Sequence, residues 1–299
     1  MKLHIATAQY PITYHTDFVA WQNHTEKWVQ SAVSQEAKIL LFPEYGSMEL
    51  VSLFSEEIRM DIRRQVIEMD ALKVAFCDTF SALAQKYQVI IIAPSFPVLE
   101  QEKIYNRVYV FSEKGLVGFQ DKFFMTRFEN EVWGISSAPK VLSLFEATWG
   151  SFGIQICYDV EFPLGSQLLC ANGASLIFAP SCTEAIRGAT RVHVGARARA
   201  LENQCYVVVS QTINTAEWSP AVDTNFGYSA FYSTSDTNFP EDGVLAIHLE
   251  QTEGWLFQTL NLELIQAVRE NGQVLNFKDS QNIETNLSHQ NIVVHKISI

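Results

Sequence analysis

Residues 153–159 read Gly153-Ile154-Gln155-Ile156-Cys157-Tyr158-Asp159, a run of strand-forming residues that stops at a thiol. A polar break follows, then Pro163 and a stretch with helical character. A cysteine at such a corner can point its sulfur out of the edge of a sheet, and the N–H groups after it can face a developing negative charge. A free cysteine is more often a small buried hydrophobic residue, so the rest of the chain has to decide between the two interpretations.

Strand and helix patterns alternate along the whole chain, which predicts an α/β layered fold with mixed sheets. Strands are predicted at 3–9, 38–42, 89–93, 105–111, 116–119, 141–145, 152–156, 175–179 and 206–210, and weaker ones at 228–232, 243–249 and 255–260. Helices are predicted at 18–32, 56–86 (with one possible break), 164–171, 188–203 and 262–270. No linker composition interrupts residues 1–270, which we expect to form one domain. The polar residues 271–299 are expected to be a surface tail or an arm onto a neighbouring subunit.

The composition is that of a globular protein with ample material for a large core, since 47% of the 299 residues are hydrophobic and 18% are charged. A net charge of −12 argues against nucleic-acid and anionic-membrane partners, which need clustered Lys and Arg. The five cysteines are an odd number with no C-x-x-C spacing, which favours a reducing compartment. The amino terminus has no signal-peptide pattern, so a cytoplasmic protein is expected.

Two other ionisable side chains also stand directly after a hydrophobic strand. Glu44 follows Leu-Leu-Phe-Pro at 40–43, where the proline ends the strand. Lys122 follows the strand at 116–119 and precedes three apolar residues. Taken singly, Glu44 has an ordinary interpretation as a loop carboxylate and Lys122 as a lysine at a strand end. Because α/β proteins place their sites at the carboxyl ends of strands, the two residues and Cys157 together favour a catalytic group.

A thiol, a carboxylate and an ammonium are sufficient for acyl transfer without histidine or metal. A nearby lysine favours the thiolate and so lowers the thiol pKa. A carboxylate can take the thiol proton and return it to a leaving amine, and the ammonium can stabilise the oxyanion of a tetrahedral intermediate. The sequence contains no Gly-rich phosphate loop and no H-E-x-x-H helix, so we expect neither a cofactor nor a metal.

Three blocks of the chain resemble the signature of the carbon-nitrogen hydrolase (nitrilase) superfamily. They are Leu-Phe-Pro-Glu at 41–44, Asp-Lys at 121–122 and Gly-Ile-Gln-Ile-Cys-Tyr-Asp at 153–159. Residues 198–207 are similar to a fourth block of the family, and residues 5–9 fit its first strand. The resemblance runs in the family's order from residue 3 to residue 270.

The resemblance implies a four-layer α-β-β-α sandwich with a Glu-Lys-Cys triad in a single domain. Carried over, Cys157 is the nucleophile, Glu44 the general base and Lys122 the oxyanion-stabilising cation. The backbone N–H of Tyr158 would be the second oxyanion donor.

The resemblance also implies a second glutamate between the lysine and the cysteine. Glu131 is the expected residue by its distance from Lys122, and Glu129 is a real alternative. Trp133 would then wall the substrate pocket, and Cys182, which follows a predicted strand, is a further pocket candidate.

The implied activity is that of a thiol amidohydrolase, which cleaves the C–N bond of a small linear amide through a thioester and releases ammonia or an amine. A nitrile or an N-carbamoyl compound remains an alternative substrate, because Glu161 and Leu164 depart from the family's pattern beside the pocket. A non-catalytic scaffold or small-molecule sensor is an alternative of another class, and a Cys-His peptidase would require His193 as the base. The expected partners are a small-molecule substrate and other copies of the chain, as a homodimer or larger homo-oligomer.

Overall fold

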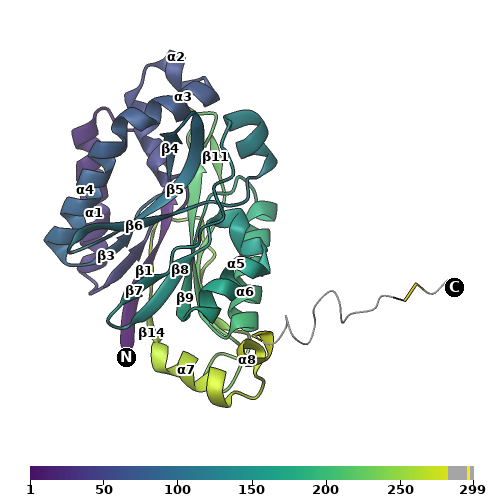
Figure 1. The fold of residues 1–299 in the computed structure, drawn as a ribbon. Helices are drawn as coiled ribbons and strands as arrows, with labels where there is room; N and C mark the ends of the chain where they lie inside the picture. The colour runs from purple at the N-terminus through teal and green to yellow at the C-terminus, as the bar shows by residue number, and fades with distance from the viewer. Residues whose placement is uncertain (282–294, 297–299) are drawn as a thin grey trace.

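The long strand β1 (Lys2–Pro11) is the seam from which two sheets diverge in the computed structural model, which describes residues 1–281 and 295–296 (Figure 1). It pairs in parallel with β2 (Ile39–Leu41) through Ile5–Thr7 and with β10 (Tyr206–Thr215) through Gln9–Pro11. The strands are therefore hydrogen-bonded in one continuous series through β1. The strands on the β2 side of β1 form one layer, and those on the β10 side form the other.

The strands of each sheet come largely from one half of the chain. The first sheet contains β1 and β2 with β3 (Ile90–Ile92), β4 (Phe96–Glu100), β5 (Lys103–Ser112), β6 (Gly115–Asp121) and β14 (Gly254–Asn261). The second contains β10 with β7 (Phe145–Ala147), β8 (Gly150–Ile154), β9 (Ala174–Ser181), β11 (Thr224–Asn225), β12 (Ser229–Tyr232) and β13 (Val244–His248). This mixed pairing confirms the predicted α/β class.

Buried strands of the first sheet send alternate side chains into two different cores. Ile39 and Leu41 pack into the core that also holds Phe178 of the second sheet. Leu40 and Phe42 pack on the opposite side against helical aromatics, with Phe42 and Phe80 ring centroids 5.8 Å apart. A strand has a side-chain period of two, so a continuous apolar run indicates burial on both faces.

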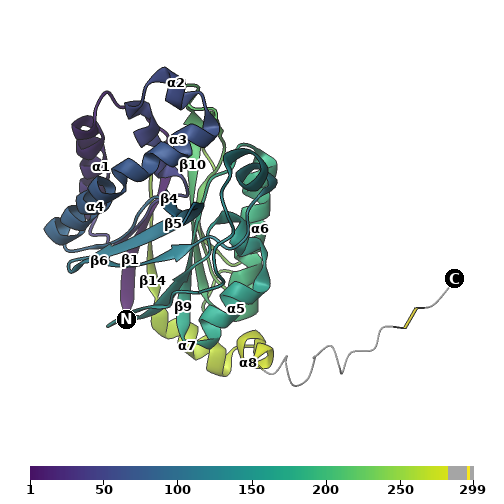
Figure 2. The ribbon, with the colours of Figure 1, turned by 45° about the horizontal axis from the view of Figure 1, so that its top comes forward.

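Two pairs of helices cover the outer faces and complete four layers. Helices α1 (Phe18–Val33) and α4 (Lys73–Tyr87) lie on the first sheet, and α5 (Pro163–Ala171) and α6 (Ile186–Asn203) on the second. Figures 1 and 2 show the two pairs on opposite sides of the strands. The predicted α-β-β-α sandwich is confirmed. None of the helices in the described part of the chain is both long and apolar enough to cross a bilayer.

Three local predictions differ from the structure. Residues 56–72 form α2 (Glu56–Arg59), α3 (Ile62–Glu68) and η2 (Met69–Leu72) before α4, and Asp61 caps α3 by accepting from the Arg64 N–H. Strand β4 was not predicted because it contains Pro97, which a sheet tolerates here at its edge. The strand predicted at 141–145 begins only at Phe145, because β7 pairs with β8 across a tight turn that ends at Gly150.

The start of the polar tail lies against the domain. Helix α7 (Leu262–Asn271) is followed by α8 (Asn276–Ser280), where the Arg269 guanidinium lies 4.0 Å from the centre of the Phe277 ring. Gln204 also accepts a hydrogen bond from the Phe277 N–H at 3.1 Å. The predicted arm onto a neighbouring subunit falls mainly on residues 282–294 and 297–299, outside the described residues.

Candidate active site

Glu44, Lys122 and Cys157 leave three different strands and meet in one buried cluster. Glu44 follows β2, Lys122 follows β6, and Cys157 starts the 3-10 turn η4 (Cys157–Glu161) shortly after β8. The Lys122 Nζ atom is 2.8 Å from Glu44 Oε1, and Glu44 and Cys157 are close enough that each shifts the pKa of the other. All three side chains are at most 4% exposed. Residues far apart in the chain thus form a thiol–carboxylate–ammonium group.

The backbone of Cys157 makes a sharp corner between the strand and the turn. Its φ of +48° lies in the left-handed region, which costs a residue with a side chain about 1–2 kcal/mol. Such strain persists at functional sites because the surrounding structure holds it in place. The Cys157 sulfur lies 3.7 Å from the Cys182 carbonyl oxygen. The strand-to-helix corner predicted from residues 153–159 is present.

The second glutamate beside the lysine is Glu129. Its Oε2 lies 2.6 Å from Lys122 Nζ, and its Oε1 accepts from the Tyr45 hydroxyl at 2.8 Å and from the Asn106 amide at 3.3 Å. The N–H and hydroxyl of Thr126 also donate to Glu129, at 3.0 and 2.9 Å. Both oxygens of this buried carboxylate therefore accept at least two hydrogen bonds each.

The expectation that Glu131 takes this place is wrong. Its side chain is 55% exposed and pairs with the 88%-exposed Arg127 at 3.0 Å. Both glutamates belong to the single π-helical turn η3 (Phe128–Trp133), and the turn directs Glu129 inward and Glu131 outward.

Lys122 is held charged between the two carboxylates. Burial alone would lower the pKa of Lys122, but Glu129 and Glu44 overcome it and raise the pKa well above its ordinary value. Burial likewise works to raise the pKa of Glu129, yet its contacts with Lys122, Thr126 and Tyr45 lower it. Glu44 is different, because burial raises its pKa despite the neighbouring lysine. Of the two carboxylates, Glu44 is therefore the better proton acceptor.

The thiol of Cys157 does not have the lowered pKa that the sequence led us to expect. Burial and the charge of Glu44 raise the pKa of Cys157 well above 9.0, and the attraction of Lys122 is too small to reverse this. The resting site therefore holds a thiol beside a carboxylate, and the proton has to move to Glu44 before the sulfur can attack.

Alkylation should reveal this protonation state. Iodoacetamide reacts with the thiolate, so Cys157 should react more slowly at neutral pH than a free cysteine and its rate should still rise above pH 9.0. Glu44→Gln removes a charge that raises the thiol pKa and should move the profile to lower pH. The rates are measured by mass spectrometry of the Cys157 peptide. A plateau already reached at neutral pH would contradict the assignment.

Asp159 ties the cysteine turn to the segment that carries Lys122. Its Oδ1 accepts from the Phe124 N–H at 2.8 Å, and its Oδ2 accepts from the Phe123 N–H at 3.0 Å. The side chain is 2% exposed. This residue was not among those predicted, although it stands only two positions after the thiol and could have been considered for that reason.

Removing this tie should destabilise the fold. Asp159→Ala leaves two backbone N–H groups near residue 123 without an acceptor, which should lower the free energy of unfolding by about 1–3 kcal/mol. The exposed Asp223 is the matched control, and Asp223→Ala should change that free energy by less than about 0.5 kcal/mol. Urea denaturation followed by fluorescence measures both, and equal losses would refute the role of Asp159.

The two predicted pocket residues border the cluster. The Trp133 ring lies 4.8 Å from the Tyr45 ring, centroid to centroid, and the Cys182 N–H donates to Glu44 Oε2 at 2.9 Å. Tyr45 and Asn106 were not predicted; Asn106 also donates to Glu44 Oε1 at 2.8 Å. Asparagine is unusual inside a strand, so the position of Asn106 within β5 was the sequence signal that could have pointed to it.

His193 is not placed to act as the base of a Cys-His pair. Its Nδ1 lies 2.8 Å from the Tyr232 hydroxyl and its Nε2 2.9 Å from Gln211 Oε1. Burial lowers the pKa of His193 to about 4. Both ring nitrogens are therefore used in packing the second sheet against α6.

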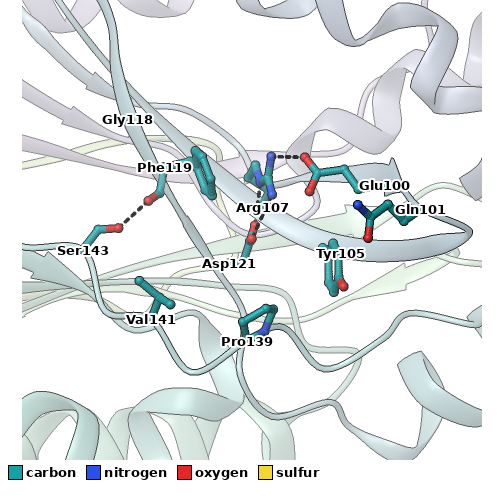
Figure 3. Close-up of a pocket in the computed structure, with 10 residues that line it drawn as sticks. All are labelled: Glu100, Gln101, Tyr105, Arg107, Gly118, Phe119, Asp121, Pro139, Val141 and Ser143. Atoms are coloured by element: carbon teal, nitrogen blue, oxygen red, sulfur yellow. Dashed lines mark hydrogen bonds and ion pairs between the residues drawn. The ribbon is translucent and has the colours of Figure 1, made fainter.

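A separate pocket lies along β5 and β6, and its lining does not include Glu44, Lys122 or Cys157. Its volume is about 780 Å³ and its lining includes Tyr105, Pro139 and Val141. Figure 3 shows the Arg107 guanidinium in this pocket, paired with Glu100 at 2.7 Å and with Asp121 at 2.6 Å. The cation here is already neutralised by two carboxylates, and no thiol lines the pocket.

Comparison with known proteins identifies the family. The carbon-nitrogen hydrolase family model matches residues 4–270. "Probable hydrolase YhcX" of Bacillus subtilis is 33% identical over 275 residues, 92% of this chain and 53% of that protein. "Omega-amidase NIT3" of Saccharomyces cerevisiae is 28% identical over 64% of this chain and 65% of that protein. The chain thus spans less than two thirds of the length of these relatives.

Solved structures agree on the fold. The carbon-nitrogen hydrolase of Helicobacter pylori superposes with a TM-score of 0.77 at 17% identity, over 96% of this chain and 98% of that chain. A yeast member of branch 10 of the nitrilase superfamily gives 0.70 at 23% identity, over 90% and 93% of the two chains. With a family model that matches nearly the whole domain, this chain belongs to the carbon-nitrogen hydrolase family.

Proposed function

We propose that the protein is a thiol amidohydrolase that cleaves the C–N bond of a small linear amide and releases ammonia or an amine. One observation carries the proposal. A buried lysine lies 2.8 Å and 2.6 Å from two buried carboxylates, and the first of these, Glu44, is close enough to the Cys157 thiol for its charge to raise the thiol pKa. These are the groups that acyl transfer through a cysteine requires.

In the first half of the reaction the amide is converted to a thioester. Glu44 takes the proton of Cys157 and the sulfur attacks the carbonyl carbon, so that a C–S bond forms and the carbonyl oxygen becomes an oxyanion. Glu44 then gives the proton to the amide nitrogen as the C–N bond breaks. The raised pKa of Glu44 suits both transfers.

In the second half, water replaces the amine. Glu44 takes a proton from water, the water oxygen attacks the thioester carbon, and the C–S bond breaks as the sulfur regains its proton. The carboxylic acid leaves, and the enzyme returns to its starting state. Glu129 takes no proton in this scheme, because its hydrogen bonds lower its pKa and hold it ionised beside Lys122.

Lys122 and the backbone N–H of Tyr158 are proposed to bind the oxyanion in both halves. Lys122 is fixed by two carboxylates, so it does not have to reorganise as the charge develops. Loss of one such donor typically costs about 2.7–4 kcal/mol of transition-state stabilisation.

The names of relatives favour an amide as the substrate. They include an omega-amidase of Saccharomyces cerevisiae and a deaminated glutathione amidase of Synechocystis. Ammonia release from a panel of ω-amides, N-carbamoyl amino acids and aliphatic nitriles tests the choice, with Cys157→Ser as the control. Turnover of nitriles alone, or of N-carbamoyl compounds alone, would replace the amide assignment. No turnover of any class by a protein that labels at Cys157 would favour the sensor or scaffold.

We also propose that the protein forms a homo-oligomer through α5 and α6. The two helices pack on each other and expose five large apolar side chains, Leu164, Leu168, Ile186, Val194 and Leu201, each at least 44% accessible. Burying apolar area of this kind between copies is favourable. Light scattering should show a mass at least twice that of the chain, and a stable monomer would reject the proposal.

A further inference from the structure

Three potential metal ligands converge outside the catalytic cluster. His15 lies between β1 and α1, His24 lies within α1, and Glu49 lies in the 3-10 helix η1 (Gly46–Leu53). One ligand atom from each residue falls within 4.8 Å of the other two. All three residues lie on the side of the first sheet that α1 covers. Neither Lys122 nor Cys157 belongs to this group.

The spacing of these atoms suits a tetrahedral metal. His15 Nε2 is 3.5 Å from Glu49 Oε2, and His24 Nε2 is 3.9 Å from Glu49 Oε1. With metal–ligand bonds of about 2.0–2.2 Å, two ligands of a tetrahedral Zn²⁺ lie about 3.4 Å apart. Both measured distances are close to this value, and they run to the two different oxygens of the Glu49 carboxylate.

Within the described residues, the buried His15 ring has a nitrogen without a hydrogen-bond partner, and the buried Glu49 carboxylate has no lysine or arginine paired with it. His15 is 5% exposed, and its Nε2 has no hydrogen-bond partner. Glu49 is fully buried, and within the described residues its only cationic neighbours would be these histidines. Buried polar groups without partners are rare, and an ion is one accepted explanation for such a group.

Surrounding groups orient the ligands as an outer shell would. The Tyr10 hydroxyl donates to Glu49 Oε2 at 2.8 Å and the Thr13 N–H to Oε1 at 2.9 Å. Ser52 accepts from the His15 N–H at 3.1 Å and donates to the Glu49 carbonyl, which links both ligands. Such partners fix the ligand orientation in known metal sites.

A shallow pocket gives access from solvent. Its volume is about 330 Å³, and His24, Trp28 and Glu253 are among its lining residues. The Trp28 indole N–H donates to His24 Nε2 at 3.1 Å. The His24 Nε2 lone pair that accepts this hydrogen bond cannot also bind a metal. An incoming ion therefore has to displace the Trp28 indole at the rim of this pocket.

We propose that His15, His24 and Glu49 bind one divalent transition-metal ion of the Zn²⁺ type, with a water from this pocket as the fourth ligand. Imidazole and carboxylate donors suit this class of metal, and three protein ligands plus water is a common tetrahedral set. The site differs from the absence of metal expected from the sequence, and it is independent of the amidohydrolase mechanism. Bound metal would hold η1, which begins two residues after Glu44, against β1 and α1.

Metal binding to the purified chain tests the proposal. After dialysis against a chelator, calorimetric titration with Zn²⁺ should show one equivalent per chain, and Co²⁺ should give the intense visible absorption of a tetrahedral complex. His15→Gln and His24→Gln should each weaken binding at least about tenfold, since even outer-shell partners are worth about 10–100-fold. His24 is 26% exposed at the pocket rim, so the second variant should keep its fold even if the first does not.

Two control variants separate this site from other donors. His248→Gln removes a histidine that contacts Thr252 outside the cluster and should bind with unchanged affinity. Cys157→Ser removes the catalytic thiol and should also bind one equivalent. Absence of saturable binding, unchanged affinity in His24→Gln, or loss of binding in Cys157→Ser would each overturn the proposal.

Discussion

Cys157→Ser is expected to reduce amide hydrolysis by up to about 10⁶-fold, the order of loss found when the nucleophile of a covalent catalyst is removed. A serine hydroxyl has a far higher pKa than a thiol, and Glu44 is too weak a base to ionise it. The fold should be unaffected, because the substitution changes one atom at a position whose left-handed backbone is held by its surroundings.

The measurement compares thiols that differ only in position. Ammonia release is followed in Cys157→Ser and in Cys182→Ser, whose sulfur lies beside the same cluster but whose N–H, which binds Glu44, is retained. Cys182→Ser should keep most of the activity, as should Cys77→Ser on α4. After incubation with substrate, mass spectrometry of the parent chain should find the acyl adduct on Cys157. An adduct on Cys182, or substantial activity in Cys157→Ser, would reject the proposed nucleophile.

Glu129→Gln should lower kcat by about 10- to 100-fold. The change removes the negative partner at 2.6 Å from Lys122 and leaves the ammonium with Glu44 alone. A buried hydrogen bond to a charged group is worth about 1.5–3 kcal/mol, and each 1.4 kcal/mol is about one factor of ten in rate. Lys122 should then be drawn toward Glu44, which makes that carboxylate a weaker base.

Glu131→Gln is the matched control, because it makes the same chemical change two residues away. Glu131 pairs with Arg127 in solvent, and an exposed pair of this kind contributes about 0.3–0.5 kcal/mol. Its kcat should therefore stay within about twofold of the parent value. Both variants are first checked for unchanged circular dichroism. Equal losses in the two variants, or a larger loss in Glu131→Gln, would show that the geometry around Lys122 does not govern the rate.

The layers could be predicted because they depend on a local periodicity. Residues 39–42 are apolar without interruption, and a strand of this kind is buried on both faces, as Leu40 and Leu41 show. Strand β4 was not predicted because Pro97 lacks the N–H group that a strand normally donates. A proline is tolerated in a strand at the sheet edge, and the sequence does not show that β4 lies there. The break-up of residues 56–72 likewise depends on packing that the helical pattern does not contain.

The candidate site was predictable in its residue types but not in its contacts. Glu44, Lys122 and Cys157 each follow a strand, and the family blocks contain all three. The choice between Glu129 and Glu131 depends on the rotation of the chain in η3. Residues two apart on a helical turn point to nearly opposite sides, so an uncertainty of one residue in the start of the turn reverses the choice.

By itself the sequence determined the order of most strands and helices, the two-faced burial of the first sheet, and that a thiol, a carboxylate and an ammonium each follow a strand, because these features depend on local patterns. Only the tertiary structure decided that Glu129 contacts Lys122, that burial keeps the Cys157 proton in place, and that His15 and Glu49 meet. These features are set by distances and desolvation between segments remote in the chain, and no local pattern contains either quantity.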